Sequence, residues 1–131
     1  MRGSLIAAAV AALGFLASAG VQAPADNSMM MSPRDRAMYI VTRLGMCSDC
    51  HGADFHGSML PFVPAPGVKM PWAAKAPSIA GLRMFKSDAA AVRFLETGVL
   101  PGGGHARPPM PEYRMKSEDA HAVVMYLRSL K

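Results

Sequence analysis

The chain has 131 residues and a formal net charge of +5 at pH 7, with hydrophobic residues over 51% of its length. This length suits a single domain after any leader is removed. The basic residues are dispersed and lack interleaved aromatic residues, which argues against a nucleic-acid-binding protein, whereas a weakly basic balance fits docking to an acidic partner.

The first 25 residues have the pattern of a secretory signal peptide. Arg2 precedes an uncharged apolar run over residues 5–16, and small residues follow up to Ala25. This run is shorter than the ~20 residues that a membrane-spanning helix needs. We therefore expect cleavage after Ala25, or alternatively after Ala19, and a periplasmic mature domain of residues 26–131 without a transmembrane segment.

A first helix is predicted to begin after Ser32, which suits an N-cap, with Pro33 at the first helical position. Its expected end is Gly45. Four apolar residues recur at helical spacing and should form its buried face: Ala37, Ile40, Val41 and Leu44.

The next five residues, Cys47-Ser48-Asp49-Cys50-His51, spell the attachment signature of a c-type haem. On one helical turn, the two cysteines and the histidine project from one side. Cys47 and Cys50 can then form thioethers with the two vinyl groups of one haem, and His51 can ligate the iron. The signature occurs once, which predicts one covalent haem c per chain.

Other uses of the two cysteines fit less well. A disulfide within C-x-x-C closes a very short loop, and a thioredoxin-like motif expects a βαβ context that the sequence around it lacks. A closed zinc site would lack a clear fourth ligand. His56 is a further histidine, but it follows His51 too closely to reach the opposite face of a haem as an iron ligand.

Residues 58–82 are predicted to form a long loop, because prolines interrupt them and their apolar residues show no period. Such a loop can pack onto a haem plane. Trp72, the one tryptophan, could donate its indole N–H to a haem propionate or could lie in the core.

Two further helices are predicted after this loop. The first runs from its N-cap Ser87 to Thr97, where Gly98 stops it. The last begins with Ser117 as N-cap and runs to about Leu130. The residues expected to face inward are Val92, Phe94 and Leu95 in the former, and Ala120, Val123 or Val124, Leu127 and Leu130 in the latter.

Met110 is the best candidate for the second axial ligand among the 12 methionines. Pro108, Pro109 and Pro111 surround it and stiffen the chain, so that less ordering entropy opposes a weak thioether–iron bond. His105 is the main rival, but it follows three glycines and is expected to be exposed. His121, within the last predicted helix, is expected to be a solvated or capping residue.

These motifs resemble the class I cytochromes c. The resemblance rests on residues 39–52, on Pro109-Met110-Pro111-Glu112-Tyr113 and on Val124-Met125-Tyr126-Leu127. It implies an all-α fold of three to four helices and long loops wrapped around one covalently bound haem with His/Met ligation. It also implies a close crossing of the first and last helices, with Gly45 or a neighbour against Tyr126, and a loop proline carbonyl that accepts from His51, for which Pro61 and Pro64 are candidates.

The resemblance extends to small single-haem cytochromes that serve as electron-transfer subunits of bacterial periplasmic dehydrogenases. We therefore expect an electron carrier rather than an enzyme, which docks transiently to redox partner proteins. Two alternatives stay open. One is a haem enzyme or small-ligand sensor with an open sixth coordination site, and the other is a thiol oxidoreductase without haem.

Overall fold

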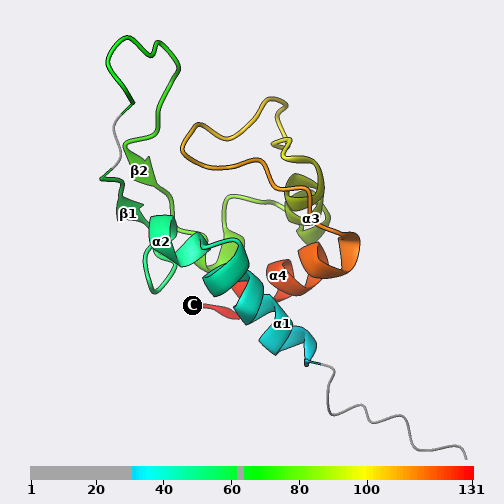
Figure 1. Ribbon diagram of the computed structural model, residues 1–131. Coiled ribbons are helices and arrows are strands. Elements are labelled where there is room, and N and C mark those ends of the chain that lie inside the picture. The colour runs from blue at the N-terminus through cyan, green and yellow to red at the C-terminus, as the bar shows by residue number, and fades with distance from the viewer. Residues whose placement is uncertain (1–30, 62–63) are drawn as a thin grey trace, which may run out of the picture.

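The computed structural model describes residues 31–61 and 64–131 of the chain. The predicted signal peptide, residues 1–25, and the predicted start of the mature domain lie outside the described residues. The described part consists mainly of four α-helices and long loops (Figure 1), which confirms the predicted all-α class. None of its helices is both long and apolar enough to cross a membrane.

Helix α1 (Pro33–Tyr39) begins as predicted. Asp35 N donates to Ser32 Oγ at 3.1 Å, and that hydroxyl donates to the Asp35 carboxylate at 2.7 Å. The first bond satisfies a backbone donor that the first turn leaves free, and the second fixes the orientation of the capping hydroxyl.

The helix continues as a π-helical turn, η2 (Ile40–Leu44), closed by Gly45 N donating to Ile40 O at 2.7 Å. The prediction that Leu44 lies on the buried face is wrong, because 62% of it is exposed. A π turn holds one more residue than an α turn, so the apolar spacing that suits an α-helix no longer points Leu44 inward.

Helix α2 (Cys47–His51) places the whole attachment signature on one helical turn, as predicted. Met46 separates it from η2 with a left-handed φ of 47°, and Gly52 ends it with a φ of 84°. The chain therefore bends sharply on both sides of the signature.

The predicted long loop contains short regular elements. Strand β1 (Ser58–Met59) pairs antiparallel with β2 (Lys75–Ala76), and the 3₁₀ turn η3 (Ala80–Leu82) follows. Residues 64–74 extend away from the helices before the chain returns to β2 (Figure 1). The two-residue strand pair is too short to leave a period in the sequence.

Helices α3 (Asp88–Thr97) and α4 (Ser117–Ser129) lie close to the predicted bounds. Ser87 Oγ accepts from Ala90 N at 3.2 Å, and Gly98 ends α3 in the left-handed region, as predicted. The prediction of Ser117 as N-cap is wrong by one residue. Lys116 holds that position and gives no side-chain cap.

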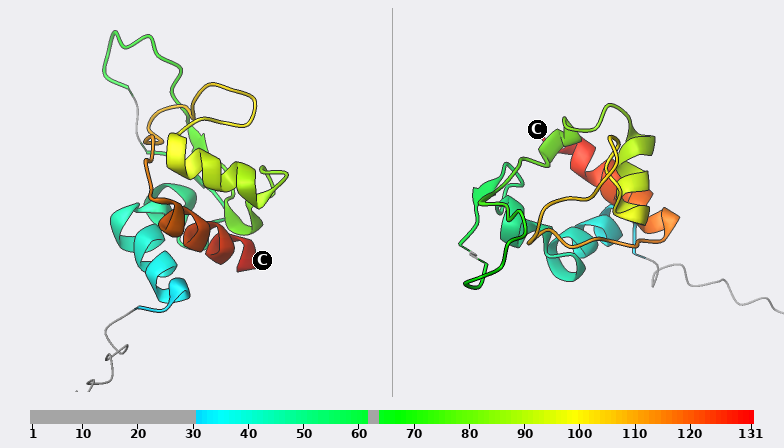
Figure 2. Two further views of the ribbon diagram at one scale, coloured as in Figure 1. Left: turned by 90° about the vertical axis from the view of Figure 1, so that its right-hand side faces the viewer. Right: turned by 90° about the horizontal axis from the view of Figure 1, so that it is seen from above.

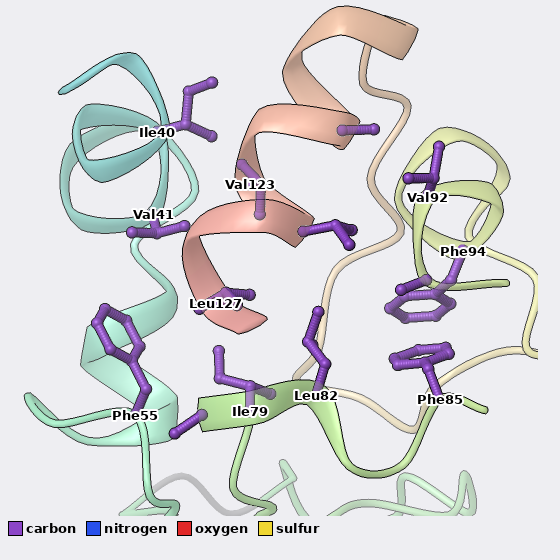
Figure 3. Close-up of a cluster of buried hydrophobic side chains, with 14 residues drawn as sticks. Ile40, Val41, Phe55, Ile79, Leu82, Phe85, Val92, Phe94, Val123 and Leu127 are labelled. Carbon is purple, nitrogen blue, oxygen red and sulfur yellow. The ribbon is translucent and has the colours of Figure 1, made fainter. Parts of the chain in front are cut away.

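The core forms where α4 packs between α1 and α3 (Figure 2). Ala37 is fully buried on α1, and the predicted inward face of α4 is buried apart from the half-buried Leu130. Figure 3 shows side chains of η2, η3, α3 and α4 meeting here, together with Phe55 and Phe85. The buried cluster comprises Ile40, Val41, Phe55, Ile79, Ala80, Leu82, Phe85, Ala91, Val92, Phe94, Ala120, Val123, Val124 and Leu127.

Candidate haem site

His51 is the one buried polar or charged residue in the described part of the chain, with 6% of it exposed. Its Nδ1–H donates to the Pro77 carbonyl at 2.7 Å. The expected proline acceptor therefore exists, but the candidates Pro61 and Pro64 were wrong. Pairing of β1 with β2 turns the chain back, so that the residue after β2, rather than those after β1, lies beside α2.

This hydrogen bond decides which ring nitrogen of His51 carries the proton. With Nδ1 donating to a carbonyl, Nε2 keeps its lone pair and can ligate a metal. A carbonyl that accepts from a metal-bound imidazole also fixes the ring orientation and raises its basicity. The His51 ring is thus prepared as an axial ligand.

The backbone around His51 is tightly tied. Gly57 N donates to His51 O at 2.7 Å, and Gly57 has a φ of 95°. A Cβ on Gly57 would lie 2.8 Å from Ala76 O and 3.0 Å from the carbonyl carbon of Pro77. Only glycine permits both this backbone conformation and this close approach of the strand that carries the acceptor.

Phe55 holds the acceptor segment in place, a role that the sequence did not reveal. Its carbonyl accepts from Ile79 N at 2.8 Å, Ala80 N at 3.0 Å and Ser78 Oγ at 3.3 Å. Its buried ring packs edge-on against Tyr126, with centroids 6.3 Å apart. Phe55 has a left-handed φ of 63°, which is an uncommon conformation for a bulky residue. Its role is therefore visible in the backbone conformation and not in the sequence.

Cys47 and Cys50 are free and half-buried on α2. Burial raises the pKa of the Cys47 thiol, against a smaller opposing effect of its hydrogen bond with Tyr113. Two unpaired thiols and an imidazole with a free Nε2 therefore lie on one turn. This donor set fits a covalently attached haem with His51 on the iron.

Met110 lies in the loop between α3 and α4, half-buried and packed against the core cluster. Two hydrogen bonds fix the chain just before it. Met110 N donates to Arg107 O at 3.1 Å, and Ala73 N donates to Pro108 O at 2.7 Å. The second bond joins the methionine loop to the segment that continues through β2 to Pro77.

Tyr113 fastens the loop on the other side of Met110. Its hydroxyl donates to Gly45 O at 2.6 Å, across 68 residues of sequence. A Cβ on Gly45 would lie 3.3 Å from Cys47 Sγ and 3.5 Å from the Tyr113 hydroxyl. The close approach expected between Gly45 and Tyr126 is therefore made to Tyr113 instead.

At the crossing of the first and last helices, the small buried residue is Ala37. Tyr126, on the last helix, meets Phe55 and the guanidinium of Arg34, which lies 5.7 Å from the ring centroid. The crossing of the first and last helices thus exists as the resemblance implied.

The remaining candidates lie apart from this constellation. Three exposed histidines have other hydrogen-bond partners: His56 with Asp54 O at 2.9 Å, His105 with Gly98 O at 3.2 Å, and His121 with Ser117 O at 2.8 Å. Trp72 is half-buried and directly precedes Ala73, so it sits where the extended segment meets the methionine loop.

A family model described as Cytochrome c matches residues 42–131, which include the attachment signature and the loop around Met110. No curated protein matches the chain.

Proposed function

The chain belongs to the cytochrome c family, and from this premise we propose that it is a periplasmic electron carrier whose haem c iron is ligated by His51 and Met110. The family's covalent haem supplies reversible one-electron exchange between ferric and ferrous iron. Cys47 and Cys50 fit the attachment motif, and His51 follows them. The observation that carries the proposal is the buried His51, oriented by the Pro77 carbonyl beside two free thiols.

Each residue then has a defined task. Cys47 and Cys50 fix the macrocycle to α2, and Pro77 holds the His51 ring in the orientation and tautomer that ligation needs. Met110 fills the sixth position from a loop that hydrogen bonds hold on both sides. With both axial positions filled, an exogenous substrate reaches the iron only by displacing a ligand, which suits electron transfer better than catalysis.

The setting of the protein is proposed from the sequence. The signal-peptide pattern supports export to the periplasm, and the positive net charge supports transient docking to an acidic redox partner. The likeness to small single-haem cytochromes supports a place beside a dehydrogenase or respiratory complex, as a subunit or as a soluble shuttle. Co-purification from native periplasm and membranes distinguishes these two arrangements.

The first test is the absorption spectrum of the oxidised, exported protein, together with its mass. We expect a mass increased by one haem and a sulfur–iron charge-transfer band that Met110→Ala abolishes. Met125→Ala is the matched control, because Met125 is 71% exposed on α4 and should leave the band unchanged.

Two results would contradict the proposal. A mature mass without haem would favour the thiol oxidoreductase. A spectrum that Met110→Ala does not alter would favour a haem enzyme or sensor with an open sixth site.

A further inference from the structure

Met110 lies between two attachments to the rest of the protein. Two residues before it, Pro108 O accepts from Ala73 N at 2.7 Å. Three residues after it, the Tyr113 hydroxyl donates to Gly45 O at 2.6 Å. The first attachment uses backbone atoms alone, whereas the second depends on one side-chain oxygen that a single substitution removes.

The partner of Tyr113 lies on the haem-attachment segment. Gly45 ends η2 and precedes Cys47 by two residues, and a Cβ built on Gly45 would meet both Cys47 Sγ, at 3.3 Å, and the Tyr113 hydroxyl, at 3.5 Å. The hydroxyl therefore joins the loop that carries one proposed axial ligand to the segment that carries the haem thioethers. Beyond Tyr113, Met115 N donates to Leu95 O at 3.0 Å, which fixes the far end of the loop on α3.

We propose that Tyr113 is a positioning residue that sets how readily the Met110 thioether leaves the iron. This inference rests on the proposed function, in which Met110 is an axial ligand. A thioether is a weak ligand, and its bond to iron persists only if the loop needs little further ordering to hold it. Without the hydroxyl, the loop loses one anchor and Gly45 O loses its donor, so states with Met110 detached become more populated.

Imidazole is a suitable probe, because it binds ferric haem only when the sixth position opens. Its apparent affinity equals its affinity for the open state multiplied by the fraction of open protein, so a rise in affinity reports a rise in the open fraction. We expect Tyr113→Phe to bind imidazole about fivefold more tightly than the unmodified protein, the change in equilibrium that one ordinary hydrogen bond produces. Tyr39→Phe is the matched control, because Tyr39 is 46% exposed on α1.

A purely structural role for Tyr113 gives a different result. In that case urea would unfold Tyr113→Phe at a lower concentration, and the imidazole affinity would equal that of the unmodified protein, which would overturn the inference. In a Met110→Ala background the sixth position is already open. There, we expect Tyr113→Phe to leave imidazole affinity unchanged, and a fivefold effect in that background would also overturn the inference.

The outcome is separable from failure of the proposed function. If the unmodified protein shows no sulfur–iron charge-transfer band, the ligation by Met110 fails, and the inference fails with it. The other case is that the band is present and Tyr113→Phe leaves unchanged both the imidazole affinity and the imidazole concentration that removes the band. In that case only the positioning role of Tyr113 fails.

Discussion

Gly57 shows how closely a single residue can control the candidate site. The position demands a φ of 95°, which L-residues with side chains rarely adopt. The position also has no room for a side chain, because a Cβ on Gly57 would lie only 2.8 Å from Ala76 O. Since Ala76 directly precedes Pro77, any displacement of β2 moves the carbonyl that orients His51.

We therefore expect Gly57→Ala to lower the free energy of unfolding by about 2 kcal/mol, as a strained backbone and a steric clash together imply. It should also shift the reduction potential, because the bond between Pro77 O and His51 lengthens. Urea denaturation and a redox titration measure the two effects. Gly67→Ala is the control, since Gly67 has a φ of 87° but no atom within 4 Å of the added Cβ. Equal losses in both variants would contradict the clash.

Among single residues, those that could be predicted from the sequence belong to a motif with a characteristic local spacing. The spacing of Cys47, Cys50 and His51 sufficed for the attachment turn, which the structure places on α2. The roles of Pro77 and Tyr113 were not predicted, because each acts through a contact with a distant part of the chain. A backbone carbonyl leaves no trace in residue type, so nothing local distinguished Pro77 from the other prolines of the loop.

Among the elements, α1 and α4 are joined by an ion pair between the middle of α1 and the first turn of α4. Arg36 donates to both carboxylate oxygens of Asp119, with Nη2 to Oδ2 at 3.1 Å. This bond, assisted by the positive charge of Arg36, lowers the pKa of Asp119. A carboxylate with a lowered folded-state pKa stabilises the protein above its unfolded-state pKa, near 3.9, and the effect disappears as the pH falls through the folded-state value.

Asp119→Asn should therefore unfold more easily than the unmodified protein at pH 7, and the difference should shrink as the pH falls below the unfolded-state pKa of about 3.9 and through the lower folded-state pKa. Urea denaturation at a series of pH values provides the comparison. Glu118→Gln removes a charge from the same first turn and controls for the interaction with the helix dipole. A difference that persisted unchanged at pH 2 would rule out the ion pair as its source.

The elements themselves were largely predictable, because caps and glycine stops act locally. Ser32, Ser87 and Gly98 have the predicted roles. The exception is η2, where a π turn altered the face presented by Leu44. There, a hydrogen bond from Gly45 N to Ile40 O replaces the usual α-helical hydrogen bond. Which of the two bonds forms depends on tertiary contacts, such as that between Gly45 O and Tyr113.

On the scale of the whole molecule, Arg128 connects three separate parts of the chain. From α4, its guanidinium donates to Gly81 O at 2.8 Å, Leu82 O at 3.1 Å and Phe85 O at 3.0 Å, and to Asp88 at the start of α3 at 2.7 Å. From the sequence alone, Arg128 is recognisable only as a basic residue in the last turn of a predicted helix, where a positive charge is favourable. Its carbonyl partners lie more than forty residues earlier, in a turn with left-handed φ values at Gly81 and Leu82. The sequence did not predict that this turn would meet the last helix.

We expect Arg128→Met to lower the free energy of unfolding by about 2–3 kcal/mol, because several acceptors lose a charged donor at once. Arg128→Lys should recover only part of this loss, since an ammonium lacks the planar fork that reaches all of them. Thermal or urea denaturation measures both. Arg93→Met, on the exposed side of α3, is the control and should change stability little. Full recovery by lysine would show that charge alone matters.

The short segment from Ala73 to Pro77 has a consequence for the speed of electron exchange. One end binds Pro108 beside Met110, and the other binds the His51 ring. With His51 and Met110 as the proposed axial ligands, this segment, stiffened by its pairing with β1, would connect the loop of one ligand to the ring of the other. It would hold both side chains in place while the iron changed oxidation state. The reorganisation energy of the proposed electron exchange would then be small.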